Sequence, residues 1–100
     1  MIRDRRLAVL LALVAPLACA NDIVRGGELY RQHCASCHGM QGMSTWPGAP
    51  SFARREAMLQ PDGTLVDRIR AGRNAMPAYR GILTDRDILS IVTYTRTLMR

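Results

Sequence analysis

Lysine is absent from this chain of 100 residues, and all 14 of its basic residues are arginine. Aromatic residues make up only 5% of the sequence, and no basic segment is interleaved with them. No nucleic-acid recognition motif is present, so the composition does not indicate a nucleic-acid-binding protein. The chain also lacks a paired-carboxylate motif, a nucleophile elbow and a phosphate-binding glycine loop, which leaves no support for the enzymes that use them.

Strand patterns are missing as well. No stretch shows four or more clean alternations of apolar and polar residues, so we expect no β-sheet. A first helix is expected from about Asp22, which can cap its start, to the cysteines near position 34. Glycine, proline and serine are frequent over residues 39–50 and predict a loop there.

Further helical segments follow this loop. We expect a short helical piece over 52–59 and a helix over 64–71. The last helix begins at Thr84 as its N-cap, with Asp87 in the third helical position, close to a capping box. Its apolar face, at helical spacing, consists of Ile88, Ile91, Val92, Thr95 and Leu98.

The first twenty residues are typical of a secretory signal peptide. Arginines at positions 3, 5 and 6 precede an apolar run over 7–17 and the small residues 18–20. The run is too short and wrongly flanked for a membrane-spanning helix. We therefore expect a signal peptide over 1–20, one domain over 21–100, and a periplasmic location.

A second interpretation of this leader remains open. Leu17-Ala18-Cys19 resembles a lipoprotein cleavage site, in which a lipid on Cys19 would tether the protein to a membrane. Pro16 stands where such a site usually has leucine. Cleavage after Ala20 would instead remove Cys19 and leave no odd thiol.

The most informative motif is Cys34-Ala35-Ser36-Cys37-His38, whose C-x-x-C-H spacing indicates a c-type haem attachment site. Two thiols three positions apart can each form a thioether with one vinyl group of the same porphyrin. The following imidazole then lies beneath the ring. We expect one covalently bound haem c, held by Cys34 and Cys37, with His38 as an iron ligand.

Two other interpretations of this motif are weaker. A thioredoxin-like cysteine pair should lie near a strand–helix–strand pattern, and none is visible. A structural zinc site needs about four ligands, and only Cys19 and His33 remain as further candidates. We expect His33, which precedes Cys34, to be exposed and without a role.

The iron's second axial ligand is predicted to be Met76. It lies between Gly72 and Gly81, and Pro77 biases it toward an extended backbone that could cross the open haem face. The alternative is that Met76 is a flexible core residue. The remaining methionines of the exported part are too close to His38 or lie in expected helices: Met40, Met43, Met58 and Met99.

With these motifs in place, residues 21–100 resemble the small bacterial class I cytochromes c. Gly26, Tyr30 and Cys34 match the spacing of the family's first helix, and residues 73–79 resemble its methionine-ligand loop. The resemblance implies an all-α cytochrome c fold of three to four short helices around one haem. It also implies that the first and last helices cross near Gly26.

The family's loop proline accepts a hydrogen bond from the histidine ligand. Pro50 is the expected counterpart here, with Pro47 as a competitor. His and Met ligation, a pairing that raises the reduction potential, would leave the iron no open position. The expected function is outer-sphere transfer of single electrons rather than enzymatic catalysis.

Charge suggests the partners. The exported part has eleven arginines and seven acidic residues, a balance of +4 before the haem propionates are counted. Arg73 and Arg80 lie near the expected haem edge, so we expect a monomer that meets redox proteins with acidic surfaces. Two alternatives stay open: a haem subunit of a larger dehydrogenase or reductase complex, and a haem enzyme or gas sensor if Met76 is not a ligand.

Overall fold

The structure is a computed structural model that describes residues 15–100, with side chains from residue 22 onward. The elements in chain order are α2 (Ala15–His33), α3 (Ala35–His38), the 3₁₀ helix η1 (Arg55–Met58), α4 (Asp62–Ala71) and α5 (Asp85–Arg96). Within residues 15–100 there is no strand, only two isolated bridges. The expected all-α fold is confirmed.

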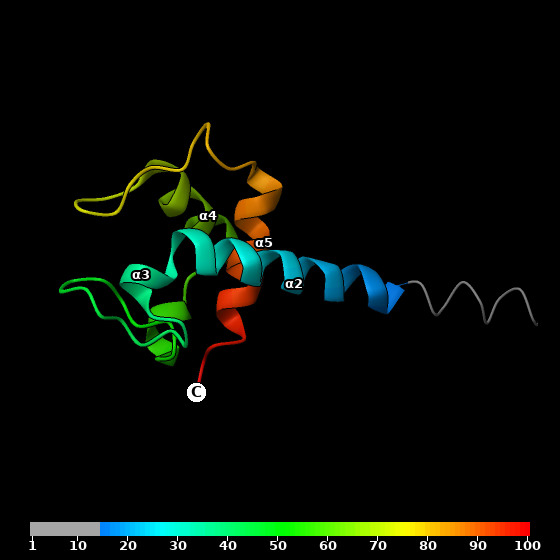
Figure 1. The fold of residues 1–100 in the computed structure, drawn as a ribbon, viewed down its shortest axis with the longest axis horizontal. Helices are drawn as coiled ribbons and strands as arrows, with labels where there is room; N and C mark the ends of the chain where they lie inside the picture. The colour runs from blue at the N-terminus through cyan, green and yellow to red at the C-terminus, as the bar shows by residue number, and fades with distance from the viewer. Residues whose placement is uncertain (1–14) are drawn as a thin grey trace, which may run out of the picture.

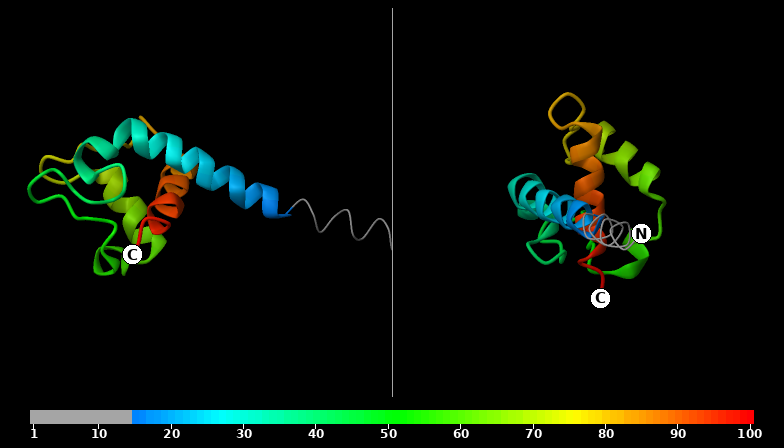
Figure 2. Two further views of the ribbon diagram at one scale, coloured as in Figure 1. Left: turned by 60° about the horizontal axis from the view of Figure 1, so that its bottom comes forward. Right: turned by 90° about the vertical axis from the view of Figure 1, so that its right-hand side faces the viewer.

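The arrangement is simple. In Figure 1, α2 lies across α5, and two long loops extend beyond the end of α2 that carries α3. The other views in Figure 2 show the same crossing, with α4 on the side of α5 away from α2. None of the described helices is long and apolar enough to cross a membrane. Most of the predicted signal peptide, residues 1–14, lies outside the described residues.

The crossing of α2 and α5 depends on Gly26. A Cβ atom at this position would overlap the Ser90 carbonyl oxygen and would come within 2.6 Å of the Ser90 carbonyl carbon. The helix backbones are therefore in direct contact, as the resemblance predicted, and only glycine permits it. Ser90 is itself buried because the α2 backbone covers it.

Aromatic and branched side chains fill the core beside this contact. The fully buried Tyr30 of α2 packs at 5.3 Å from the Tyr94 ring and at 6.3 Å from the Phe52 ring. The predicted inner face of α5 is buried through Ile88, Ile91, Val92 and Thr95. Burial of such side chains is the main favourable term in folding.

The start of α5 is as predicted. Thr84 is the N-cap, and its hydroxyl oxygen accepts a hydrogen bond from the Asp87 backbone N–H at 3.1 Å. This bond satisfies one of the N–H groups that a helix start leaves without a partner.

Three helix boundaries differ from expectation. The first described residue, Ala15, already belongs to α2, so Asp22 lies within the helix and does not cap it. The preceding residues include good helix formers, and nothing in them stops the helix. The helix expected to begin at Thr64 is α4, and it begins at Asp62. Proline is common where a helix starts, and the Pro61 carbonyl accepts hydrogen bonds from the backbone N–H groups of Thr64 and Leu65. The expected piece over 52–59 is shorter, spanning Arg55–Met58.

The end of α5 ties the connecting segments together. Arg96 donates to the Asp62 carboxylate at 2.8 Å and to the carbonyls of Met58 and Gln60 at 2.9 and 2.8 Å. Four residues further on, the backbone N–H of Arg100 donates to the Ala53 carbonyl at 2.9 Å. The corner between η1 and α4 is thereby fixed to α5.

Replacing Gly26 by alanine should destabilise the protein by about 2–3 kcal/mol, because the new methyl group forces two backbones apart. Gly63 of α4 is the matched control, since a Cβ there meets nothing within 4 Å. Gly63→Ala should be neutral or stabilising by up to about 1 kcal/mol. Urea unfolding of the haem-loaded variants measures both, and equal effects would contradict the backbone-contact interpretation.

Candidate functional site

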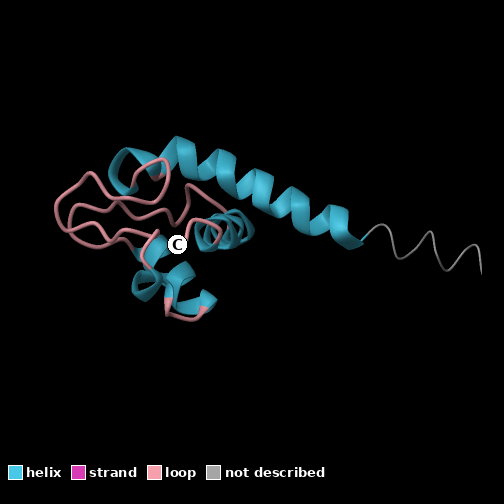
Figure 3. Cartoon of the chain, turned by 90° about the horizontal axis from the view of Figure 1, so that it is seen from below, coloured by secondary structure: helices cyan, strands magenta, loops and turns pink. Residues whose placement is uncertain are grey.

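A cavity of about 540 Å³ lies where α2 ends. This is within the usual size range of ligand and cofactor pockets. Figure 3 shows the loops gathered at this end of the molecule, away from the body of α5. Four segments line the cavity: the α2–α3 junction, residues 46–50, α4 through Arg68, and residues 73–79.

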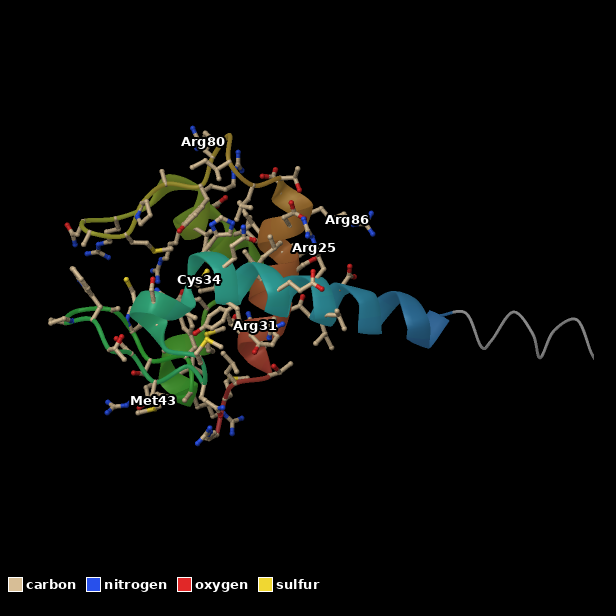
Figure 4. All side chains as sticks on the ribbon, in the orientation of Figure 1. Arg25, Arg31, Cys34, Met43, Arg80 and Arg86 are labelled. Atoms are coloured by element: carbon tan, nitrogen blue, oxygen red, sulfur yellow. The ribbon has the colours of Figure 1, made fainter. Side chains whose placement is uncertain are left out.

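Cys34 and Cys37 both line this cavity, and both thiols are free and partly buried. Figure 4 shows Cys34 at the junction of α2 and α3. Burial, followed by the neighbouring Cys37, raises the pKa of the Cys34 thiol to about 11. Reactive redox cysteines have lowered pKa values, so these surroundings disfavour the thioredoxin-like interpretation.

His38 is buried and has a defined orientation. Its Nδ1 lies 3.0 Å from the Pro50 carbonyl oxygen, and its ring stacks on Phe52 with centroids 4.3 Å apart. A carbonyl oxygen can only accept, so Nδ1 carries the proton and Nε2 keeps a free lone pair. A hydrogen-bonded ring of this kind is typical of metal-binding histidines. The partner is Pro50, as expected, and not Pro47.

The loop after α3 holds this short helix in place. The Cys37 carbonyl accepts from the backbone N–H groups of Thr45 and Trp46 at 3.0 and 3.3 Å. The Thr45 hydroxyl donates to the Ser36 carbonyl at 3.1 Å. Carbonyls at a helix end lack partners within the helix, and this polar loop supplies them.

Met76 reaches the cavity from the opposite loop. Its backbone exchanges two hydrogen bonds with Arg73, at 3.0 and 2.9 Å, which closes a tight turn. Asn74 in that turn has φ +53°, a conformation that asparagine tolerates better than most residues. Of the five methionines in residues 22–100, Met76 alone lines the cavity, and Met58 is buried in the core instead.

Tyr79 fastens the Met76 loop to α2. Its hydroxyl donates to the His33 carbonyl at 3.1 Å, and its backbone N–H donates to the Ile69 carbonyl at 3.1 Å. Burial is the largest reason that the pKa of Tyr79 is raised, so its hydroxyl stays protonated and remains a donor.

Sequence reasoning misjudged His33 and missed Arg68. His33 was expected to be exposed and idle, but it is partly buried, lines the cavity and packs edge-on against Tyr79 at 5.5 Å. Arg68 lines the cavity from α4. Its position one helical turn before Gly72, where the Met76 loop starts, is the one sequence signal that could have indicated it.

The residues of the cavity fit a covalently attached haem. Two thiols at C-x-x-C spacing, an imidazole with a free Nε2 and a thioether share one cavity with proline, alanine and aromatic side chains. These donors are those that c-type haem uses. Within residues 22–100, no group of three or more His, Cys, Asp and Glu side chains is placed to hold a metal ion.

Comparisons with known proteins agree with this geometry. Residues 21–94 match the family model described as cytochrome C oxidase, cbb3-type, subunit III. Cytochrome c6 of Thermosynechococcus vestitus is 32% identical over 89 residues, covering 85% of this chain and 78% of that protein. Cytochrome c6 of Synechococcus elongatus is 30% identical over 77 residues, covering 73% and 86%. The solved structure of the KustC0563 c-type cytochrome aligns with a TM-score of 0.69 at 29% identity, covering 75% of this chain and 98% of that one.

A few helices around a cavity with two thiols at its edge define a small haem protein of the c type. This chain belongs to the class I c-type cytochromes, within the domain family that the matching model describes. It carries covalently bound haem c with its iron.

The Tyr79 hydroxyl should stabilise the loop that bears Met76. We expect Tyr79→Phe to lower the free energy of unfolding by about 1 kcal/mol, because the hydrogen bond from this hydroxyl to the His33 carbonyl is lost. Tyr94→Phe is the matched control, since the Tyr94 hydroxyl makes no hydrogen bond within residues 22–100. The measurements are urea unfolding and the rate of proteolytic cleavage within residues 72–80. Equal behaviour of the two variants would contradict the role of the hydroxyl.

Proposed function

We propose that this chain is an exported carrier of single electrons. In this proposal Cys34 and Cys37 form the thioether bonds to haem, and His38 and Met76 are the axial ligands of its iron. Residues 1–20 are removed as a signal peptide, and residues 21–100 act as a monomeric domain in the periplasm. The cytochrome c6 names of the relatives support the carrier role.

The observation that carries the proposal is that one cavity contains all four side chains. His38 is oriented by its hydrogen bond to the Pro50 carbonyl, and Met76 comes from a separate loop across the cavity. When bound, the haem supplies an iron that gains or loses one electron. His38 and Met76 would hold the iron from its two sides and would exclude small molecules from the metal, which favours electron transfer through the ring edge.

A second candidate function is favoured by one finding. The matching family model describes a subunit of the cbb3-type cytochrome c oxidase, so the domain could serve as a fixed haem subunit of a larger complex. Purification of the native protein under mild conditions separates the two, because a subunit comes with stoichiometric partners and a free carrier comes alone. A lipid on Cys19 would show as a membrane-bound fraction whose mass includes acyl chains.

Absorption spectra of the haem-loaded protein test the ligand assignment. We expect a low-spin spectrum in both redox states, a sulfur-to-iron charge-transfer band in the oxidised state, and no carbon monoxide binding at neutral pH. Met76→Ala should abolish the band and allow carbon monoxide to bind, because an axial position opens. Carbon monoxide binding by the unaltered protein would instead favour the enzyme or sensor alternative.

Met43→Ala is the matched control for this experiment. Met43 is half exposed and lies outside the cavity, and Figure 4 shows it in the lower loop. Its removal should leave both spectra unchanged. A Met76→Ala variant indistinguishable from Met43→Ala would remove Met76 from the ligand set.

Electron exchange should depend on salt. The arginines near the cavity favour a partner with an acidic surface, and long-range attraction between opposite charges speeds their encounter. We expect the exchange rate with an acidic partner to fall roughly tenfold between low and high ionic strength. Stopped-flow mixing measures it, with a small uncharged oxidant as the control whose rate stays constant. A rate with the acidic partner that is equally insensitive would rule out charge steering.

A further inference from the structure

The charged side chains that line the cavity are all positive. Within residues 22–100, Arg68 and Arg73 are the arginines that line it, and no acidic side chain does. Neither guanidinium makes an ion pair or a side-chain hydrogen bond in the described part of the chain. The protein thus brings two positive charges to the cavity wall and supplies no negative charge to balance them.

Most acidic residues in 22–100 pair with other arginines. Arg25 lies 3.5 Å from a carboxylate of α5, and Arg70 lies 3.3 Å from one at the same helix start. Together with Arg96, these arginines hold five acidic residues in ion pairs: Glu28, Asp62, Asp67, Asp85 and Asp87. The contrast with Arg68 is clearest on α4, where Arg70, only two positions away, has two acidic partners.

The backbones of the two cavity arginines are both held by hydrogen bonds. Arg68 belongs to α4, and its carbonyl accepts from the Gly72 N–H at 2.9 Å, which closes the helix end. Arg73 is the first residue of the turn that its backbone closes with Met76. One guanidinium therefore comes from a helix and the other from the adjoining loop.

We propose that Arg68 and Arg73 are the carboxylate-binding pair of this cavity, that they hold the propionates of the haem, and that they raise its reduction potential. Guanidinium groups bind carboxylates through two parallel hydrogen bonds, the geometry that suits a propionate. The inference rests on the proposed function, since it requires haem in this cavity.

The sign of the effect follows from electrostatics. Oxidised iron carries one more positive charge than reduced iron, so a nearby cation disfavours the oxidised state. The arginines also balance the propionate charges, which would otherwise stabilise the oxidised state. Removing either guanidinium should therefore lower the reduction potential.

Potentiometric titration of haem-loaded variants tests the pair. Arg68→Gln and Arg73→Gln should each shift the equilibrium with a redox mediator at least threefold toward oxidation, about 28 mV at 59 mV per tenfold change for one electron. Arg86→Gln is the matched control, because it removes the same charge from the exposed start of α5, which Figure 4 shows away from Cys34. We expect its shift to be below about 1.5-fold, since solvent screens it.

Arg68→Lys separates charge from mere packing. The reduction potential of Arg68→Lys should stay close to that of the unaltered protein, because lysine is also a cation that can bind a carboxylate. If Arg68 served only packing, restoring the charge would not restore the potential. If Arg68→Gln fails to take up haem, the reduction potentials of Arg73→Gln and Arg68→Lys still test whether the two arginines raise the potential. Shifts equal to that of Arg86→Gln, in variants with an unchanged low-spin spectrum, would overturn the inference. A wild-type protein without that spectrum would overturn the proposed function instead.

Discussion

The close approach of α2 and α5 at Gly26 is the contact on which the rest of the molecule depends. α2 continues directly to Cys34 and His38, so its direction sets where the attachment motif lies. α5 anchors the other segments, because Arg96 at its end holds the η1–α4 corner and Arg100, four residues further on, holds Ala53. One backbone contact without an intervening side chain therefore fixes the motif relative to the loops that complete the cavity.

Regular structure brings the chain to the cavity, but single hydrogen bonds orient the side chains within it. His38 is set by the carbonyl of Pro50, and the Met76 loop is set by Tyr79 donating to the carbonyl of His33. Both acceptors are backbone groups of residues that themselves line the cavity. His33, which forms one wall of the cavity, thus also holds the loop of Met76 on the other side through Tyr79, so the two sides are linked across 46 positions of sequence.

Much of this was predictable because it is local. The C-x-x-C-H spacing, the Thr84 cap and the helical apolar face of α5 each depend on neighbours in sequence, and the structure has them where expected. Asp22 was wrongly predicted to begin the first helix, because a residue that can cap a helix does not stop one that already runs through it from Ala15. His33 and Arg68 were misjudged or missed, because their surroundings are made by residues 73–79, which only the tertiary fold brings near.

The placement of charge unites these observations. Acidic residues are concentrated on α4, α5 and the outer part of α2, where three arginines neutralise most of them and help to hold the helices together. The arginines at the cavity are left unbalanced by the chain itself. If Arg68 and Arg73 are engaged by carboxylates within the cavity, their charge is largely cancelled at the surface. Attraction of an acidic partner then falls to cations just outside, of which Arg80 is the nearest in sequence to the Met76 loop. Under these proposals arginine has three tasks in this protein, which differ in whether its counterion belongs to the chain, the cofactor or the partner.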